Sequence, residues 1–320
     1  MSEYQEEYCS IEDVLIKLKT DGVAVIPNII SKAKLKLYRK QLWKMLYHLT
    51  QKLEKPINKK DQDTWRTFYE LFPLHSMLIQ HWAIGHSKLA WDIRQEKKVI
   101  KVFSKIWKVL PEELLVSFDG MSVHFPPEVT NKGYYRGNDW FHTDQSQKKK
   151  DLCCIQGMVT LFDINEGDAT FRYIKKSNNY HEPFFQDHDI KSMSDWYKLK
   201  DGEIDYFKDL QIGSIKAKKG SLILWDSRTF HQGVESRRNR EKPNMRAIVY
   251  ICMTPRSFSI ERELKKKRKA FTNKRTTTHW PHTIRLFPKL PRTYGKPILE
   301  ITNIDDDIEL TDLGLKLAGF

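Results

Sequence analysis

Two side chains that could bind a metal ion stand close together in the segment from Trp140 to Gln145. The aromatic residues of this segment favour an extended conformation, in which alternate side chains lie on the same face of a strand. His142 and Asp144 would therefore point the same way, while Thr143 points to the other face. An imidazole and a carboxylate on one face can hold one metal ion between them, so this segment predicts part of a metal site.

A further metal ligand has to come from a distant part of the chain. The best candidate is His231, because Gly220 forms a turn before the apolar residues 222–225, which indicate a strand that leads toward the histidine. Two histidines and one carboxylate occupy one side of a divalent first-row metal and leave its other side open. This donor set suits a metal that must also bind oxygen.

Arg246 opens another apolar run, over residues 246–253. A guanidinium that enters a buried strand needs an anionic partner, since an unpaired buried charge is costly. Arg237, Arg238 and Arg240 are rivals, but they lie in a polar loop, whereas Arg246 begins a strand. We therefore expect Arg246 to bind an anion.

This set of residues resembles the iron and 2-oxoglutarate site of the phytanoyl-CoA dioxygenase-like oxygenases. Residues 161–174, followed by Ser177 and His181, and the opening residues 21–28 are also similar to that family, so the resemblance covers roughly residues 10 to 256. Three features depart from it. The gap from His231 to Arg246 is longer than usual, and the family's Pro-Gly-Ser-His turn lacks its Pro-Gly here. Gly233 also stands where some members carry a hydroxyl that helps to bind the co-substrate.

The resemblance implies a role for each of these residues. His142, Asp144 and His231 would hold Fe(II), and Arg246 would bind the far carboxylate of 2-oxoglutarate, the co-substrate. The implied reaction is hydroxylation of a C–H bond, with no catalytic acid or base beyond the metal ligands. Gln156, on the strand that follows, is a further candidate for contacting 2-oxoglutarate. Because halide binds only where the carboxylate ligand is missing, Asp144 speaks against a halogenase.

Length and periodicity predict an α+β fold. The chain has 320 residues, of which 40% are hydrophobic and 12% aromatic, which is ordinary for a folded globular protein. Residues 10–110 show mainly helical spacing, with helices expected over 31–49, 76–95 and 99–110. Residues 114–256 show many short strands, which fit a double-stranded β-helix, the cupin-type jelly roll. We expect the N-terminal helices to pack on it.

We divide the chain into an oxygenase domain, residues 1–256, and a basic C-terminal extension, residues 257–320, packed on that domain. An insertion over residues 182–212 interrupts the jelly-roll core. Its length is typical of functional segments. It is either a lid over the active site or a surface elaboration.

The net charge of +14 predicts attraction to anions such as nucleic acid, coenzyme A thioesters or phosphorylated metabolites. Residues 261–275 hold eight basic side chains. Within them, the run from Lys265 to Lys269 is a nuclear address, a phosphate-binding patch or a solvated helix face. His279 and His282 follow, and we interpret them as structural or substrate contacts and not as a second metal site.

Other functions fit parts of this pattern. One is a catalytically inactive cupin-like protein that binds nucleic acid or a protein partner through its basic C-terminal part, although this leaves the metal triad unexplained. Another is a zinc hydrolase, for which no general base is identifiable. The substrate, a small molecule or an anionic compound, is not identified: an acyl-CoA, a small metabolite, a protein side chain and a nucleobase all stay open, and so does the oligomeric state.

The sequence also bears on the cellular compartment. Four cysteines show no Cys-x-x-Cys spacing, the first residues are acidic, and no apolar run approaches the about 20 residues of a membrane span. These features predict reduced thiols, no membrane partner and a cytoplasmic protein, with the nucleus as the alternative that Lys265 to Lys269 suggests.

Overall fold

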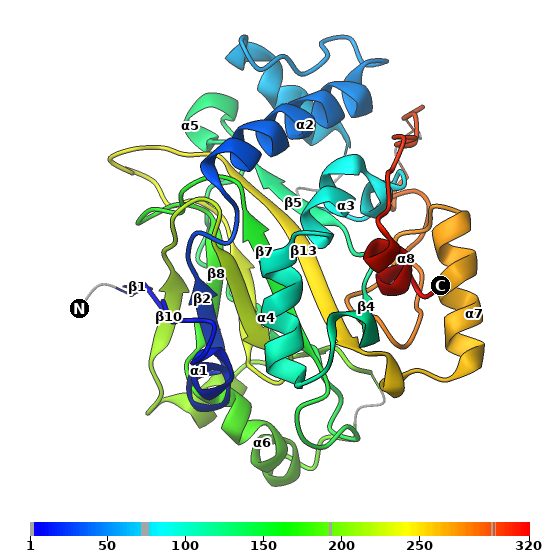
Figure 1. Cartoon of the computed structure of the whole chain (residues 1–320). Coiled ribbons are helices and arrows are strands. Elements are labelled where there is room, and N and C mark those ends of the chain that lie inside the picture. The colour runs from blue at the N-terminus through cyan, green and yellow to red at the C-terminus, as the bar shows by residue number, and fades with distance from the viewer. Residues whose placement is uncertain (1–2, 72–76, 192–193, 296, 298) are drawn as a thin grey trace.

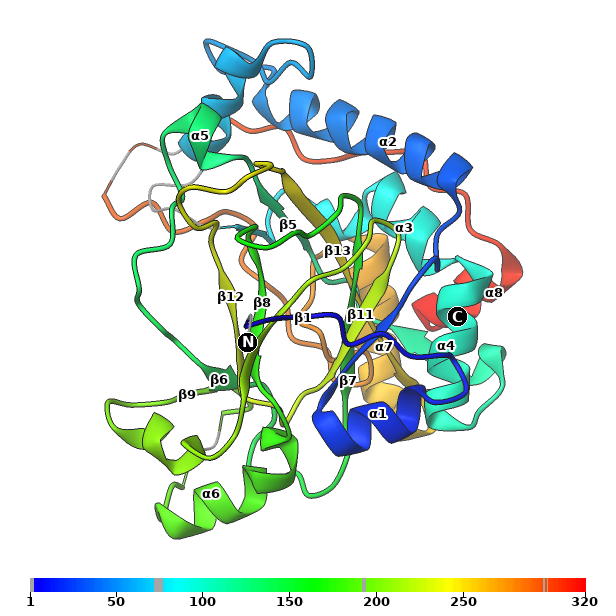
Figure 2. The ribbon, with the colours of Figure 1, turned by 90° about the vertical axis from the view of Figure 1, so that its left-hand side faces the viewer.

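A computed structural model describes the chain except residues 1–2, 72–76, 192–193, 296 and 298. Two largely antiparallel sheets face each other, and helices cover the outer side of one of them (Figures 1 and 2). The larger sheet has the order β2-β11-β7-β13-β5-β3, with β4 paired to β13: β2 (Val23–Ile26), β3 (Leu78–Ile79), β4 (Leu114–Val116), β5 (Met121–His124), β7 (Ile155–Thr160), β11 (Leu222–Asp226) and β13 (Arg246–Pro255).

The smaller sheet carries two of the candidate metal ligands. Its order is β1-β10-β8-β12-β6-β9: β1 (Tyr4–Gln5), β6 (His142–Thr143), β8 (Thr170–Ile174), β9 (Tyr197–Lys198), β10 (Ile212–Ile215) and β12 (His231–Val234). With the helices on the larger sheet, this arrangement confirms the expected α+β fold with a jelly-roll core.

Alternation along the central strands separates two apolar clusters. On β13, Val249 and Ile251 join the cluster beneath the helices, whereas Ile248 joins the cluster between the sheets. On β11, Leu224 faces the helices and Trp225 faces the other sheet. Because side chains alternate in a strand, each strand of the larger sheet presents every second residue to the space between the sheets.

The N-terminal helices α1 (Val14–Asp21), α2 (Lys32–Thr50), α3 (Lys88–Arg94) and α4 (Lys97–Trp107) lie over the larger sheet (Figure 1). The Ser31 side chain caps α2 by accepting a hydrogen bond from the Lys34 N–H. Short helices α5 (Pro127–Thr130) and α6 (His181–Asp187) lie farther along the chain. The predicted helices over 31–49 and 99–110 are confirmed within a few residues.

The predicted helix over residues 76–95 is wrong in its first part. Residue 76 lies outside the described residues, β3 occupies Leu78–Ile79, and the α-helix begins only at Lys88, where Ser87 caps it. A run of only two apolar residues, such as Leu78–Ile79, is compatible with a helix or a strand. Pairing of Leu78 with Ser122 on β5, far along the chain, decides for the strand.

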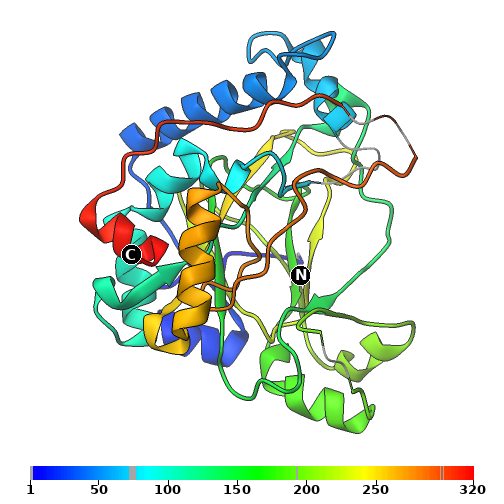
Figure 3. The ribbon, with the colours of Figure 1, turned by 90° about the vertical axis from the view of Figure 1, so that its right-hand side faces the viewer.

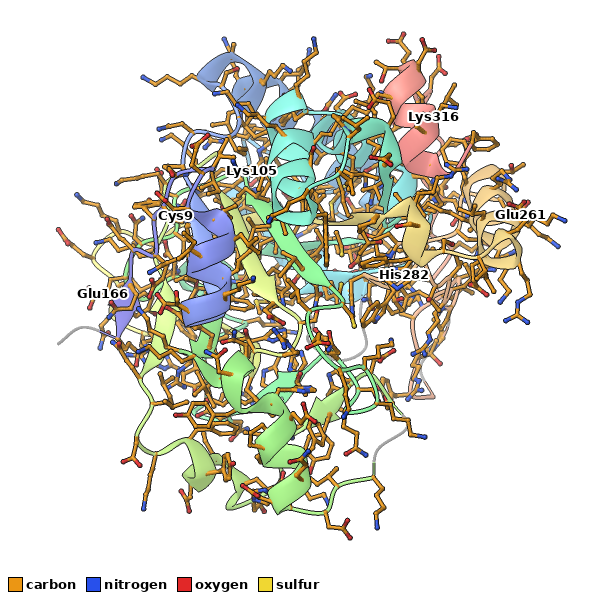
Figure 4. The ribbon with its side chains drawn as sticks, turned by 60° about the horizontal axis from the view of Figure 1, so that its bottom comes forward. Cys9, Lys105, Glu166, Glu261, His282 and Lys316 are labelled. Atoms are coloured by element: carbon orange, nitrogen blue, oxygen red, sulfur yellow. The ribbon has the colours of Figure 1, made fainter. Side chains whose placement is uncertain are left out.

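The C-terminal part contacts the core at several places. Helix α7 (Glu261–Thr272) lies beside α8 (Asp312–Ala318) (Figure 3). Glu261 and Lys316 lie at their outer surfaces (Figure 4). Thr277 belongs to the chain segment that joins these two helices. Its N–H donates to the Phe118 carbonyl, and the Phe118 N–H donates to the Thr277 hydroxyl, each at 3.0 Å. The division of the chain at residue 256 stays a prediction.

The basic run lies on α7, and its side chains have different surroundings. Lys265, Lys266 and Lys269 are exposed, as a solvated helix face requires. Lys267 is buried and donates a hydrogen bond to the Val116 carbonyl. The run is therefore not one continuous basic surface. Among the described residues, no helix is long and apolar enough to span a membrane.

Gly120 allows a close approach of two backbone segments at the edge of the larger sheet. A Cβ atom on Gly120 would lie 2.0 Å from the Ile79 carbonyl oxygen, so Gly120→Ala forces the backbone apart. We expect a loss of at least about 2 kcal/mol in the free energy of unfolding, measured by chemical denaturation. Gly233→Ala is the control, since its Cβ would meet only the ends of two side chains, Met77 at 3.4 Å and Trp140 at 3.9 Å. It should cost less than about 1 kcal/mol, and equal losses in both variants would contradict the steric explanation.

Candidate active site

His142, Asp144 and His231 converge between the two sheets. Their ligand atoms lie within 4.8 Å of one another. Nε2 of His231 is 3.3 Å from one carboxylate oxygen of Asp144, and Nε2 of His142 is 3.8 Å from the other. The two histidines are buried and face each other across β6 and β12. The structure therefore brings together the three residues that the sequence nominated as metal ligands.

Asp144 is positioned by the turn between β11 and β12. Strand β6 ends at Thr143, so Asp144 lies just beyond it. The Ser227 carbonyl accepts hydrogen bonds from the Asp144 N–H and from the Thr143 hydroxyl, both at 2.9 Å. The apolar strand that the sequence indicated ahead of His231 is β11, which ends at Asp226, and His231 begins β12 after that turn. The turn thus holds the carboxylate beside the second histidine.

Backbone carbonyls orient both imidazoles. Nδ1 of His231 is 2.9 Å from the Thr229 carbonyl oxygen, and Nδ1 of His142 is 3.4 Å from that of Trp140. A carbonyl only accepts, so these contacts favour the tautomer with hydrogen on Nδ1. The lone pair of each Nε2 then points toward Asp144, where a metal ion would bind.

The protonation states also suit a metal ion. Burial lowers the pKa of His142 to about 3, so its imidazole is neutral at physiological pH. Burial by itself would raise the pKa of Asp144, but the neighbouring His142 and His231 outweigh it and hold that pKa well below its ordinary value. Neutral imidazoles and an ionised carboxylate are the forms that bind divalent metals. Two nitrogens and one oxygen on one side of a cavity fit Fe(II).

The three residues open into a cavity of about 600 Å³. Such a volume, with mostly apolar walls and a few polar groups, is typical of small-molecule sites. Its large apolar and aromatic lining residues are Met77, Leu78, Trp140, Met158, Phe171, Trp196, Trp225, Tyr250 and Phe287.

Arg246 lines the same cavity from the start of β13. It is 4% exposed, and its guanidinium donates to the Ser122 hydroxyl and lies 3.8 Å from the Met158 sulfur. No carboxylate of the described residues pairs with it, and its Nε has no partner among them. A buried cation without an acid is costly. The site therefore favours an anion at this position.

The rival arginines have partners elsewhere. Arg240 forms ion pairs with Glu128 and Asp168, and Arg237 pairs with Glu3 at 2.5 Å. The third rival, Arg238, lies over the Tyr134 ring. None of the three lines the cavity.

Gln156 contacts the candidate metal ligand directly. Its side-chain N–H₂ donates to Asp144 at 2.8 Å and to the Ser227 hydroxyl at 3.2 Å. The sequence suggested a contact with the co-substrate; Gln156 does line the cavity, but its amide hydrogens are directed to the carboxylate. We infer that it orients Asp144, as partners of metal ligands commonly do.

Several further residues line this cavity, and for His279 the sequence left a structural role or a substrate contact open. Trp140 stacks on His142, with ring centres 4.7 Å apart, and Trp196, from the insertion, lies 5.8 Å from it. Thr278 and His279 reach the cavity from the C-terminal part. The unusual composition of residues 276–282 was the one sequence signal for these two. Trp196 is the only described residue of the insertion that lines the cavity, so the lid stays a prediction.

Comparisons with known proteins find similarity over most of the chain. The family model of phytanoyl-CoA dioxygenase (PhyH) matches residues 18–241, which include the metal triad and end before Arg246. Ava biosynthesis cluster protein O of Aspergillus versicolor is 27% identical over 273 residues, covering 82% of this chain and 83% of that protein.

Two solved structures are similar over most of the chain. One is a putative oxidoreductase from Salmonella typhimurium LT2, with a TM-score of 0.60 and 13% identity, covering 98% of this chain and 86% of the other. The second is GlcNAc Inducible Gene 2 from Candida albicans, with a TM-score of 0.58 and 12% identity, covering 98% and 79%. At such low identity they show a shared fold.

The Gln156 amide gives a test of the positioning of Asp144. Gln156→Leu removes the donor while keeping a side chain of similar size, so the carboxylate loses one constraint. We expect Fe(II) affinity, measured by anaerobic titration, to fall by about 10- to 100-fold. Gln41→Leu is the control, because Gln41 on α2 contacts Asp92 and lies outside the cavity. Unchanged affinity in Gln156→Leu would show that Asp144 is held without this bond.

Proposed function

Because the chain belongs to the phytanoyl-CoA dioxygenase family, we propose that it hydroxylates a C–H bond of a small molecule, with Fe(II) held by His142, Asp144 and His231. As a member of that family it is a non-haem iron, 2-oxoglutarate-dependent oxygenase. The observation that carries the proposal is the convergence of these three side chains in one cavity with Arg246, a buried cation that lacks an acid partner among the described residues.

The triad would hold iron by one side and leave the cavity side for co-substrate and oxygen. Bound iron, together with 2-oxoglutarate, supplies the oxidising chemistry. The protein supplies orientation: the Thr229 carbonyl fixes His231, while Gln156 and the Ser227 carbonyl fix Asp144. Three constrained ligands need little rearrangement when the metal binds.

Arg246 would bind the far carboxylate of 2-oxoglutarate. A planar guanidinium offers two parallel N–H groups to a carboxylate, which a lysine does not. The Ser122 hydroxyl holds the guanidinium from one side, and Met158 closes the space beside it. Burial strengthens the attraction, because little water screens it.

The aromatic walls would hold the substrate near the metal and exclude water. Trp140 and Trp196 lie against His142, and Phe171 stacks on His231 at 5.0 Å. Apolar surface close to the ligands favours a substrate that presents a C–H bond there.

An inactive scaffold that binds nucleic acid or protein would leave the triad and Arg246 without a function. Burying four such groups without ligands costs stability. A hydrolase built on the triad would likewise not use Arg246. The oxygenase proposal gives a role to all four.

Removal of each metal ligand tests the site. His142→Ala, Asp144→Ala and His231→Ala should each abolish stoichiometric Fe(II) binding, because each variant leaves only two of the three ligands. Anaerobic titration with Fe(II) and 2-oxoglutarate measures this through the weak visible charge-transfer band of the ternary complex. His48→Ala is the control, because His48 is a half-buried histidine on α2 outside the cavity, and this variant should bind iron normally. No band with the wild-type protein would reject the proposed function, and normal affinity in two of the three variants would reject the ligand set.

Arg246→Lys tests the co-substrate site. Lysine keeps the charge but loses the planar fork, so the 2-oxoglutarate concentration needed for half-maximal succinate formation should rise by about tenfold or more. Iron affinity should change little. Arg238→Lys, at an exposed loop position, should leave both quantities as in the wild type. If Arg238→Lys raises the requirement and Arg246→Lys does not, the co-substrate site is misplaced.

A further inference from the structure

The C-terminal part forms one wall of the cavity. Thr277 is hydrogen-bonded to Phe118, and the Phe287 N–H donates to the Thr276 carbonyl at 3.0 Å. Residues 276–287 therefore form a loop whose two ends are held in place. Thr278, His279 and Phe287 of this loop line the cavity. The loop lies beyond residues 18–241, which the family model matches. This wall is therefore supplied by a part of the chain outside the matched region.

His279 differs from the other histidines packed in the interior. His86 contacts the Arg275 carbonyl at 3.0 Å, and His181 contacts that of Gln145 at 2.8 Å, as structural histidines do. Nε2 of His279 is shielded from solvent, yet it has no hydrogen-bond partner among the described residues.

Two further polar atoms of residues in the cavity wall also lack a hydrogen-bond partner. The Thr278 hydroxyl and the Trp225 indole N–H are shielded and, within the described part of the chain, unpartnered. Buried polar groups in proteins are almost always hydrogen-bonded. All three atoms belong to side chains that line one cavity, so a bound molecule that reaches them would supply the missing polar partners.

The charges of the cavity disfavour a second anion. Asp119 and Glu235 line it together with Asp144, and Arg246 is the only arginine or lysine in its described lining. The proposed function assigns Arg246 to 2-oxoglutarate. None of the residues from Lys265 to Lys269 lines the cavity. An anionic substrate would therefore meet acids and no arginine or lysine that 2-oxoglutarate leaves free.

Two partly exposed tryptophans line the cavity beside His142. Trp140 and Trp196, which flank His142, are 38% and 50% exposed. Exposed aromatic surface beside a cavity commonly marks a binding site. An uncharged, largely apolar molecule would cover it.

We propose that His279 is a substrate-binding residue that hydrogen-bonds a hydroxyl or carbonyl oxygen of an uncharged, largely apolar small molecule. This rests on the proposed function, because it assumes that iron and 2-oxoglutarate occupy the triad and Arg246. The three unpartnered polar atoms give the substrate its orientation, and the aromatic residues give it most of its contact area. His279 thus selects for an oxygen at one place on an apolar skeleton.

Three probes with one carbon skeleton test this: 2-decalone, decalin and decalin-2-carboxylate. Binding to the protein loaded anaerobically with Fe(II) and 2-oxoglutarate is followed by tryptophan fluorescence, since Trp140, Trp196 and Trp225 line the cavity. We expect 2-decalone to bind at least about tenfold more tightly than the other two, and tenfold corresponds to about 1.4 kcal/mol. His279→Phe should abolish the preference for 2-decalone over decalin. His279→Gln, which keeps an N–H donor, should retain part of it.

His282→Gln is the matched control from the same loop, because His282 contacts Thr254 and does not line the cavity. It should keep the preference for 2-decalone. Tighter binding of the carboxylate, no binding of 2-decalone, or a preference that survives in His279→Phe would overturn the inference. The charge-transfer band separates the two proposals. If the wild-type protein shows no band, the proposed function fails. If it shows the band but does not prefer the ketone, only the role of His279 fails.

Discussion

The burial of two charged side chains, Asp144 and Arg246, between the two sheets is the constraint on which this site depends. Asp144 is largely buried, and it meets two imidazoles and the Gln156 amide. Arg246 is buried too, but among the described residues its partners are the hydroxyls of Ser122 and Tyr250 and the Met158 thioether sulfur. Carboxylates and guanidinium groups lose much solvation in such places. A metal cation held by the triad and an anionic co-substrate at Arg246 would complement the charges at both ends of the cavity.

The elements that hold these groups are regular and well connected. Strand β12 pairs His231 directly with His142, and the Ser227 turn links Asp144 to both sheets. By contrast, the substrate side of the cavity is built from additions: Trp196 comes from the insertion and His279 from the loop after α7. The fold thus keeps the metal geometry on paired strands, while segments outside the sheets shape what can enter. Sites built this way can change substrate without changing chemistry.

Local rules account for what the sequence could predict. Alternation placed His142 and Asp144 on one face, and the cost of a buried guanidinium favoured Arg246 over the arginines of the polar loop. Short apolar runs were the weak point, because β3 at Leu78–Ile79 depends on pairing with β5 and not on its own spacing. Contacts between distant segments were also out of reach. No spacing rule brings His279 to a cavity whose other walls lie before residue 251, and none directs the Gln156 amide to Asp144.

The basic character of the chain and the character of its cavity are separate properties. Net charge acts through the long-range field, which affects solubility and encounter with anions. Lys265, Lys266 and Lys269 contribute to that field from the exposed side of α7, whereas Lys267 is turned inward, under the Phe118 ring. Phe118 is also the residue that anchors the loop carrying His279. The C-terminal part therefore presents charge to solvent on one side and supports an apolar wall on the other, so a basic surface here is compatible with an uncharged substrate inside.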